Sequence, residues 1–189
     1  MDALVNLLSG FGLSGAAGLN AYIPLLIVAL TARFTDLITL QKPWDALEHP
    51  AIIALLVVLL IIEMTADKIP AVDSANDVVQ TVVRPVAGAI LFAAQANLIS
   101  DVHPVLAMAC GLLIAGGVHT AKATARPVIT ATTGGLGNPV VSAAEDLVAA
   151  VTTVLSILAP ALMTVFIAAL AYLAYRWLRH RRLQRASGP

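Results

Sequence analysis

Charged residues are scarce in this chain of 189 residues, of which 12% are charged and 59% are hydrophobic. A typical soluble domain carries about 25% charged residues, because polar groups must cover much of its surface. The low charge content therefore excludes ordinary soluble enzymes, nucleic-acid-binding modules and disordered chains. It predicts an integral membrane protein. Its expected partner is the lipid bilayer, and no nucleic-acid partner is expected.

Cysteine and clustered metal ligands are scarce as well. The single cysteine, Cys110, excludes a disulfide within one chain. His49, His103 and His119 are scattered along the sequence, so we expect no metal site and no cofactor. Asp2 stands where a signal peptide would have basic residues, so we expect the first apolar segment to remain in the mature protein.

Apolar segments long enough to cross a bilayer recur along the chain. A helix needs about 20 mainly apolar residues to cross the hydrocarbon core, and about five segments qualify, at 3–31, 50–66, 85–100, 104–120 and 147–177. We expect the first to be discontinuous or re-entrant, because small residues and Pro24 interrupt it. We expect Pro160 to break or kink the last one. The predicted fold class is all-α, a polytopic helical bundle.

The predicted organisation is one transmembrane domain, residues 1–178, followed by a basic tail, residues 179–189. Arginines gather at this end without an acidic residue among them: Arg176, Arg179, Arg181, Arg182 and Arg185. Positively charged ends of membrane proteins stay in the cytoplasm, so we expect a cytoplasmic C-terminus. With five spans the N-terminus would lie outside, and with a first segment in two pieces it would lie inside.

Two stretches resemble each other within the chain. HPAIIALLVVLLIIEMTADK, residues 49–68, and HPVLAMACGLLIAGGVHTAK, residues 103–122, align without a gap. Each precedes a polar connector and a further apolar segment, which suggests two repeats over residues 49–100 and 103–177. Transporters often carry such repeats and bind ligands between them, but so do some bundles that transport nothing.

Polar residues inside the apolar segments follow helical spacing. One stripe recurs at steps of three, four or seven residues and consists of Asp73, Asp77, Gln80, Arg84, Gly88 and Gln95. Because ionisable groups are costly in a bilayer, they usually face a bundle interior or a hydrated cavity.

Two further groups carry opposite charge. Glu63 and Asp67 lie four residues apart, either as a proton-binding pair or as ion-pair partners of Lys68 or Arg84. His119, Lys122 and Arg126 form a basic stripe whose expected partners are the carboxylates of the other repeat. A purely structural charge network explains both groups equally well.

Glycines interrupt the apolar pattern at two places. In TATTGGLGNPVVSAAED, Gly134, Gly135 and Gly137 allow close backbone approach and positive φ. The segment either lines a buried cavity, where its backbone would favour anions, or forms a loop outside the membrane. Gly18 and Asn20 interrupt the first apolar segment in a similar way. Such interruptions are typical of broken helices around a central site.

The stretches ADKIPAVDSANDVVQTVVRPVAGA and TGGLGNPVVSAAED, together with GLNAYIPLL, resemble the signature segments of a bacterial membrane family of unknown function, number 4126. The resemblance covers residues 10–161. It implies a small bacterial protein with several membrane spans and brings no activity, substrate or catalytic residue.

The functional prediction is a transporter or channel for a small polar or ionic solute, with or without coupling to protons, in the bacterial cell membrane. We expect no enzymatic activity, no catalytic residue and a homodimer if one chain cannot enclose a pathway. The candidate solute-binding residues are Glu63, Asp67, Asp73, Asp77, Arg84, His119, Lys122, Arg126, Asn138, Glu145 and Asp146, and the candidate backbone or gating residues are Gly18, Asn20, Gly134, Gly135 and Gly137. The alternatives are a scaffold protein with a structural charge network and, more remotely, a lipid carrier or lipid-modifying enzyme.

Overall fold

The computed structural model describes residues 2–66, 70–96 and 103–160, with isolated positions between 162 and 176. Within these ranges the side chains of residues 2–3, 70–71, 73–75, 77 and 96 are not described. In chain order the elements are α1 (Asp2–Leu19), α2 (Tyr22–Phe34), η1 (Trp44–Glu48), α3 (Pro50–Ala66), α4 (Pro70–Ala96), α5 (Pro104–Thr133) and α6 (Asn138–Leu158). The described residues form no strand, and the predicted all-α bundle is confirmed. Among the described residues, three helical segments are long and apolar enough to cross a membrane: Val78–Gln95, Pro104–Thr133 and Asn138–Leu158.

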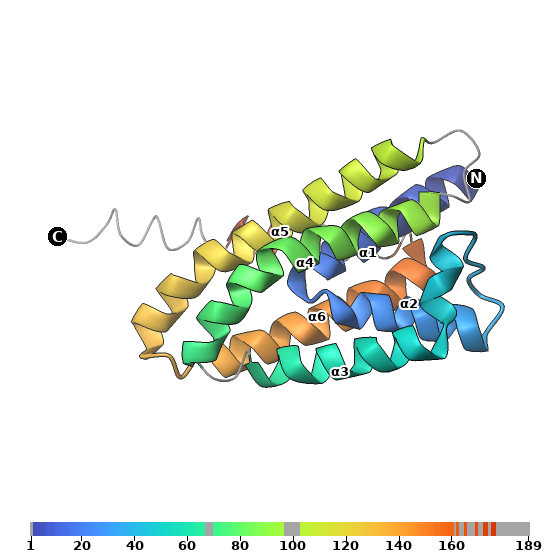
Figure 1. Ribbon diagram of the computed structural model, residues 1–189. Coiled ribbons are helices and arrows are strands. Elements are labelled where there is room, and N and C mark those ends of the chain that lie inside the picture. The colour runs from blue at the N-terminus through green and yellow to red at the C-terminus, as the bar shows by residue number, and fades with distance from the viewer. Residues whose placement is uncertain are drawn as a thin grey trace.

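The first apolar segment folds back on itself. Figure 1 shows α1 running into the bundle and α2 returning toward the end at which α1 begins. The chain leaves helical structure at Asn20, whose Oδ1 accepts hydrogen bonds from the backbone N–H groups of Tyr22 and Ile23 at 3.0 and 3.1 Å. An amide here satisfies donors that the start of a helix leaves open. The expected break in the first segment is therefore confirmed, and it lies at Asn20.

Helices α1, α4 and α5 pack against one another on small residues. A Cβ atom added to Gly111 of α5 would overlap the backbone oxygen of Gly88 in α4. A Cβ atom on Gly18 of α1 would come within 2.6 Å of the Ala115 oxygen in α5. Helix backbones approach this closely only where side chains are absent. These three helices therefore form the tightly packed centre of the bundle.

Helix α3 lies at the edge of the bundle (Figure 1) and exposes apolar side chains around much of its circumference. Leu55, Val58, Ile61 and Ile62 are all more than half exposed, whereas its buried residues are Leu56, Glu63 and Ala66. An apolar surface of this extent is unfavourable in water and suits lipid. The arrangement supports a membrane-embedded bundle.

The glycine-rich segment is a tight turn between α5 and α6. Gly134 and Gly135 have φ angles of 60° and 86° and so use the positive φ that glycine allows. Gly137 has a φ of −76° and does not use it. Its backbone N–H instead donates to Thr133 Oγ1 at 3.1 Å. The turn accordingly needs left-handed backbone only at its first two residues.

Helices α5 and α6 are longer toward this turn than the sequence indicated. Helix α5 continues to Thr133 instead of ending near residue 120, and α6 begins at Asn138 instead of near residue 147. The reason is that the threonines of α5 bond to their own helix: Thr130 Oγ1 donates to the Arg126 carbonyl at 3.0 Å, and Thr133 Oγ1 to the Ile129 carbonyl at 2.7 Å. Their hydroxyls therefore do not compete with the helix. At its other end α6 stops at Leu158, two residues before Pro160, where a break was expected.

Candidate functional site

A buried ion pair joins α3 to α4. Arg84 Nη2 donates to Glu63 Oε1 at 2.9 Å, and the two side chains are 0% and 1% exposed. The sequence left Lys68 and Arg84 as candidate partners of Glu63, and Arg84 is a partner in the structure. A charge persists in a low-dielectric interior only with a counter-charge and hydrogen bonds. Glu63 therefore ties the otherwise exposed helix α3 to the bundle.

His119 of α5 contacts the same guanidinium group. Its Nδ1 lies 3.1 Å from Arg84 Nη1, and its Nε2 lies 3.2 Å from Thr81 Oγ1. A guanidinium group can only donate hydrogen bonds, so Nδ1 must accept one and carries no proton. The ring hydrogen then resides on Nε2, where the Thr81 oxygen accepts it. These contacts are consistent with a neutral imidazole protonated on Nε2.

Two more polar side chains border this ion pair. Tyr22 of α2 interacts electrostatically with Glu63, Gln80 and Arg84. Gln80 Oε1 and Arg84 Nε are buried and have no hydrogen-bond partner among the described residues. Buried polar atoms of this kind normally bond to water or to a ligand. The sequence placed Gln80 in the polar stripe but gave no reason to connect Tyr22 with it, apart from its position just after the Asn20 break.

A second ionic group joins α5 to α6 and to the end of α1. Glu145 Oε2 lies 2.9 Å from Lys122 Nζ and 3.2 Å from Arg126 Nη2. Lys122 Nζ also donates to the Leu19 carbonyl at 3.1 Å, which suits the partial negative charge at a helix C-terminus. Glu145 belongs to the same repeat as the basic stripe, and the carboxylates of Asp73 and Asp77 in the other repeat, which were the expected partners, lie outside the described side chains.

Asn20 connects the tip of the α1–α2 hairpin to this group. Its Nδ2 donates to Asp146 Oδ1 at 2.9 Å, while its Oδ1 caps α2. One side chain thus holds both the start of α2 and the adjoining face of α6.

The two groups join along one face of α5. His119, Lys122 and Arg126 follow one another at steps of three and four residues and are all buried. We call the combined set the ionic cluster: Glu63, Arg84, His119, Lys122, Arg126, Glu145 and Asp146, with Asn20 at its edge. Its three cationic side chains match its three carboxylates, and His119 is neutral. The described part of the cluster therefore carries no formal net charge.

The described ionic cluster does not include every predicted site residue. Asp67 lies outside the described residues, as do the side chains of Asp73 and Asp77. Asn138 Nδ2 donates to Thr130 Oγ1 at 3.0 Å and so braces the α5–α6 turn. This turn, with its three glycines, lies at one end of the bundle (Figure 1), about 12 Å along α5 from Arg126. The structure thus separates the turn from the ionic cluster.

The described part of the chain contains no cluster of metal-binding side chains. No three His, Cys, Asp or Glu side chains gather there as a metal ion would require. Ser14 donates its hydroxyl hydrogen to the Gly88 carbonyl at 2.9 Å. That bond joins α1 to α4 at the level of the glycine contacts.

A family model described as a domain of unknown function, DUF4126, matches residues 7–180. The match covers the ionic cluster and nearly all of the described helices. No curated protein and no solved structure matches the chain.

Proposed function

Since the chain belongs to the DUF4126 family, whose description assigns no activity, we propose a function from the site itself: the protein moves a small polar or ionic solute across a membrane, as a transporter or channel. The observation that carries this proposal is the place of the break between α1 and α2. Asn20 is 1% exposed and bonds directly to the ionic cluster. A helix broken inside a bundle, beside charged side chains, is the arrangement that transporters use to bind solutes.

Helix ends supply chemistry that a continuous helix lacks. The end of α1 offers backbone carbonyls with partial negative charge, and the start of α2 offers N–H groups with partial positive charge. Irregular backbone is tolerated at membrane depth where protein or a hydrated cavity surrounds it. At the α1–α2 break, Lys122 holds the Leu19 carbonyl and Asn20 holds the N–H groups of α2. A solute can compete with Lys122 for the carbonyl or with Asn20 for the N–H groups.

Glu145 is the best candidate for the group that exchanges partners. Both Lys122 and Arg126 contact its Oε2, and the Glu145 side chain is 16% exposed, more than the other members of its ion pairs. Protonation of this carboxylate, or binding of a cationic solute to it, would weaken its attraction to both cations. Lys122 could then leave the Leu19 carbonyl, which couples occupancy of the site to the hairpin tip.

A structural charge network is the second candidate function, and one observation favours it. The described ionic cluster is electrically balanced and its groups are closely paired. A neutral network can lock helices in one arrangement without moving anything. Under this proposal the protein is a membrane scaffold.

The setting of the protein completes the proposal. We place it in a bacterial cell membrane with the arginine-rich C-terminus in the cytoplasm, following the charge rule for membrane proteins. The exposed apolar face of α3 offers a surface on which a second copy could pack.

The test is solute flux into proteoliposomes that contain the purified full chain. Protons, sodium, potassium, chloride, phosphate and neutral solutes are compared, for the wild type, Glu145→Gln and Asp36→Asn. Asp36 is an exposed carboxylate outside the ionic cluster and serves as the matched control. We expect Glu145→Gln to lower flux at least about tenfold, because loss of a buried charge interaction exceeds 1.4 kcal/mol, and Asp36→Asn to leave it unchanged.

Two results would overturn this reasoning in different ways. If no solute enters wild-type vesicles faster than protein-free vesicles, the transport proposal fails and the scaffold remains. If flux is real but Glu145→Gln and Asp36→Asn behave alike, the pathway does not use the ionic cluster.

A further inference from the structure

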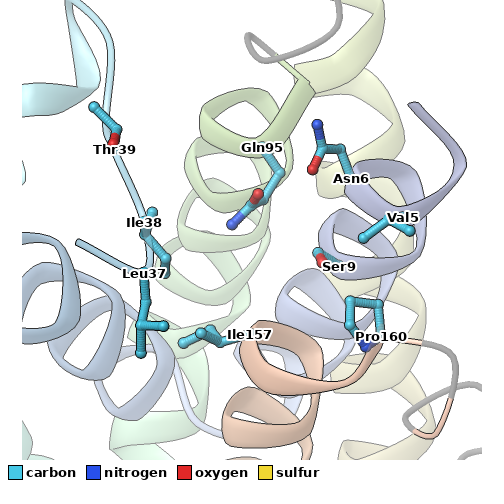
Figure 2. A pocket seen from close by; sticks show the side chains of 9 residues that line it. All are labelled: Val5, Asn6, Ser9, Leu37, Ile38, Thr39, Gln95, Ile157 and Pro160. Atoms are coloured by element: carbon cyan, nitrogen blue, oxygen red, sulfur yellow. The ribbon is translucent and has the colours of Figure 1, made fainter. Parts of the chain in front are cut away.

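A second polar site lies at the end of the bundle away from the α5–α6 turn. It is a pocket of about 340 Å³ between the start of α1, the connector after α2, and the ends of α4 and α6. Figure 2 shows four polar side chains around it, from Asn6, Ser9, Thr39 and Gln95. Its volume is at the lower end of the range for pockets that bind small molecules.

Among these side chains, Gln95 gives the strongest indication of a bound ligand. It is only 6% exposed, and its amide makes no hydrogen bond to any described residue. In Figure 2 the amide points into the space between α1 and the connector. Because the amide borders the pocket, its donors and acceptor are available to a molecule bound there.

The neighbouring polar groups face the same space with free hydrogen-bonding capacity. Ser9 Oγ donates its hydrogen to the Ser156 carbonyl at 2.7 Å, which leaves the lone pairs of the hydroxyl oxygen to accept. Asn6 and Gln95 each provide amide donors and an acceptor. A ligand that both donates and accepts hydrogen bonds would satisfy all three side chains.

The lining also indicates the charge of the ligand. None of the described residues that line the pocket is ionisable. An ion in this pocket would lose hydration without gaining a counter-charge, which is strongly unfavourable. We propose that this pocket is a binding site for a small uncharged polar molecule of the polyol type, held by the amides of Asn6 and Gln95 and by the Ser9 hydroxyl.

This site is separate from the ionic cluster. Gln95 and Arg84 are eleven positions apart on α4, which corresponds to about 16 Å along the helix. The inference goes beyond the proposed transport, because equilibrium binding can be measured without any flux. A failure of one experiment therefore leaves the other standing.

Binding is tested by saturation-transfer NMR on the full chain in detergent micelles. The probes are erythritol and tartrate, which share a four-carbon skeleton with two central hydroxyls but differ in charge. They are compared for the wild type, Gln95→Leu and Gln41→Leu, in which the same substitution is made at an exposed glutamine outside the pocket. We expect a saturable erythritol signal in the wild type and Gln41→Leu, its loss in Gln95→Leu, and no saturable tartrate signal.

A second variant covers the case in which Gln95→Leu does not fold. Thr39 is exposed at the edge of the pocket, so Thr39→Trp should fill the opening without touching Gln95 and should abolish the signal as well. No saturable erythritol signal from the wild type overturns the proposal. So does an equal signal from Gln95→Leu and Gln41→Leu, or a saturable tartrate signal stronger than that of erythritol.

Discussion

The buried pair of Glu63 and Arg84 permits a quantitative test of how the bundle is held together. We consider three variants: Glu63→Leu, Arg84→Met and the double substitution. Each replacement is apolar and close in size to the residue it replaces, so the main change is in charge. The pair is almost fully inaccessible to solvent, at 1% and 0% exposure, so little screening by water is expected.

The magnitude follows from what each variant leaves behind. A single substitution leaves one buried charge without its partner, which costs about 3–5 kcal/mol. The double substitution leaves no such charge. Its remaining cost is the donor that His119 Nδ1 loses, about 1–3 kcal/mol for an unsatisfied buried acceptor. The double variant should therefore be more stable than either single variant by about 2 kcal/mol, and the coupling energy should be on the order of 5 kcal/mol.

The free energy of unfolding can be measured by titrating SDS into mixed micelles and following helicity by circular dichroism. A difference of about 2 kcal/mol changes the unfolding equilibrium more than tenfold, well within the range of such titrations. If the losses of the two single variants simply add in the double variant, the two charges do not compensate each other. The ion pair would then not be what holds α3 to the bundle.

Three further substitutions test other parts of the structure through the free energy of unfolding. Gly111→Ala should destabilise by at least about 1–3 kcal/mol because its methyl group meets the Gly88 backbone, whereas Gly117→Ala, with nothing within 4 Å, should not; equal effects would contradict the close packing. Gln95→Leu should change the stability of the ligand-free protein by less than about 1 kcal/mol, since its amide borders the pocket and has no hydrogen-bond partner to lose among the described residues, and a larger loss of stability would show that the amide has a partner. Gly135→Ala, at a φ of 86°, should cost about 1–2 kcal/mol, and an unchanged stability would refute the left-handed turn.

Periodicity and composition predicted the faces of the helices well. The polar stripe of α4 is buried at Gln80, Arg84 and Gln95, and the basic stripe of α5 is buried at Lys122 and Arg126. These predictions hold because costly groups must face the interior whichever helix they meet there. The helix face on which a charged or polar residue lies can thus be predicted from the sequence of that helix alone.

Partners were less predictable than faces. Nothing in the spacing indicated that Lys122 and Arg126 would share one oxygen of Glu145, or that Lys122 would reach the Leu19 carbonyl. Such contacts depend on how far one helix slides along another, which the glycines of the helix interfaces determine. The pocket beside Gln95 could not be predicted from the sequence either, because four separate segments of the chain line it.

The ends of α5 and α6 were mispredicted for a local reason. A run of threonine and glycine is typical of a loop, because hydroxyl groups compete for backbone hydrogen bonds. In α5 the hydroxyls of Thr130 and Thr133 donate to carbonyls of their own helix, four residues earlier. The loop is thereby reduced to four residues, Gly134–Gly137.

The return of α2 toward the start of α1 determines how the chain is threaded through a bilayer. At 1.5 Å per residue α2 is only about 20 Å long, too short to cross the hydrocarbon core, so the hairpin contributes two apolar helices and no net crossing. The start of α1, the connector after α2 and the end of α6 all border one pocket and must share one side of the membrane. Cysteines introduced at Asn6, Thr39 and Pro160 should therefore react with an impermeant label from the same side. The chain between Thr39 and Pro160 would then make an even number of crossings.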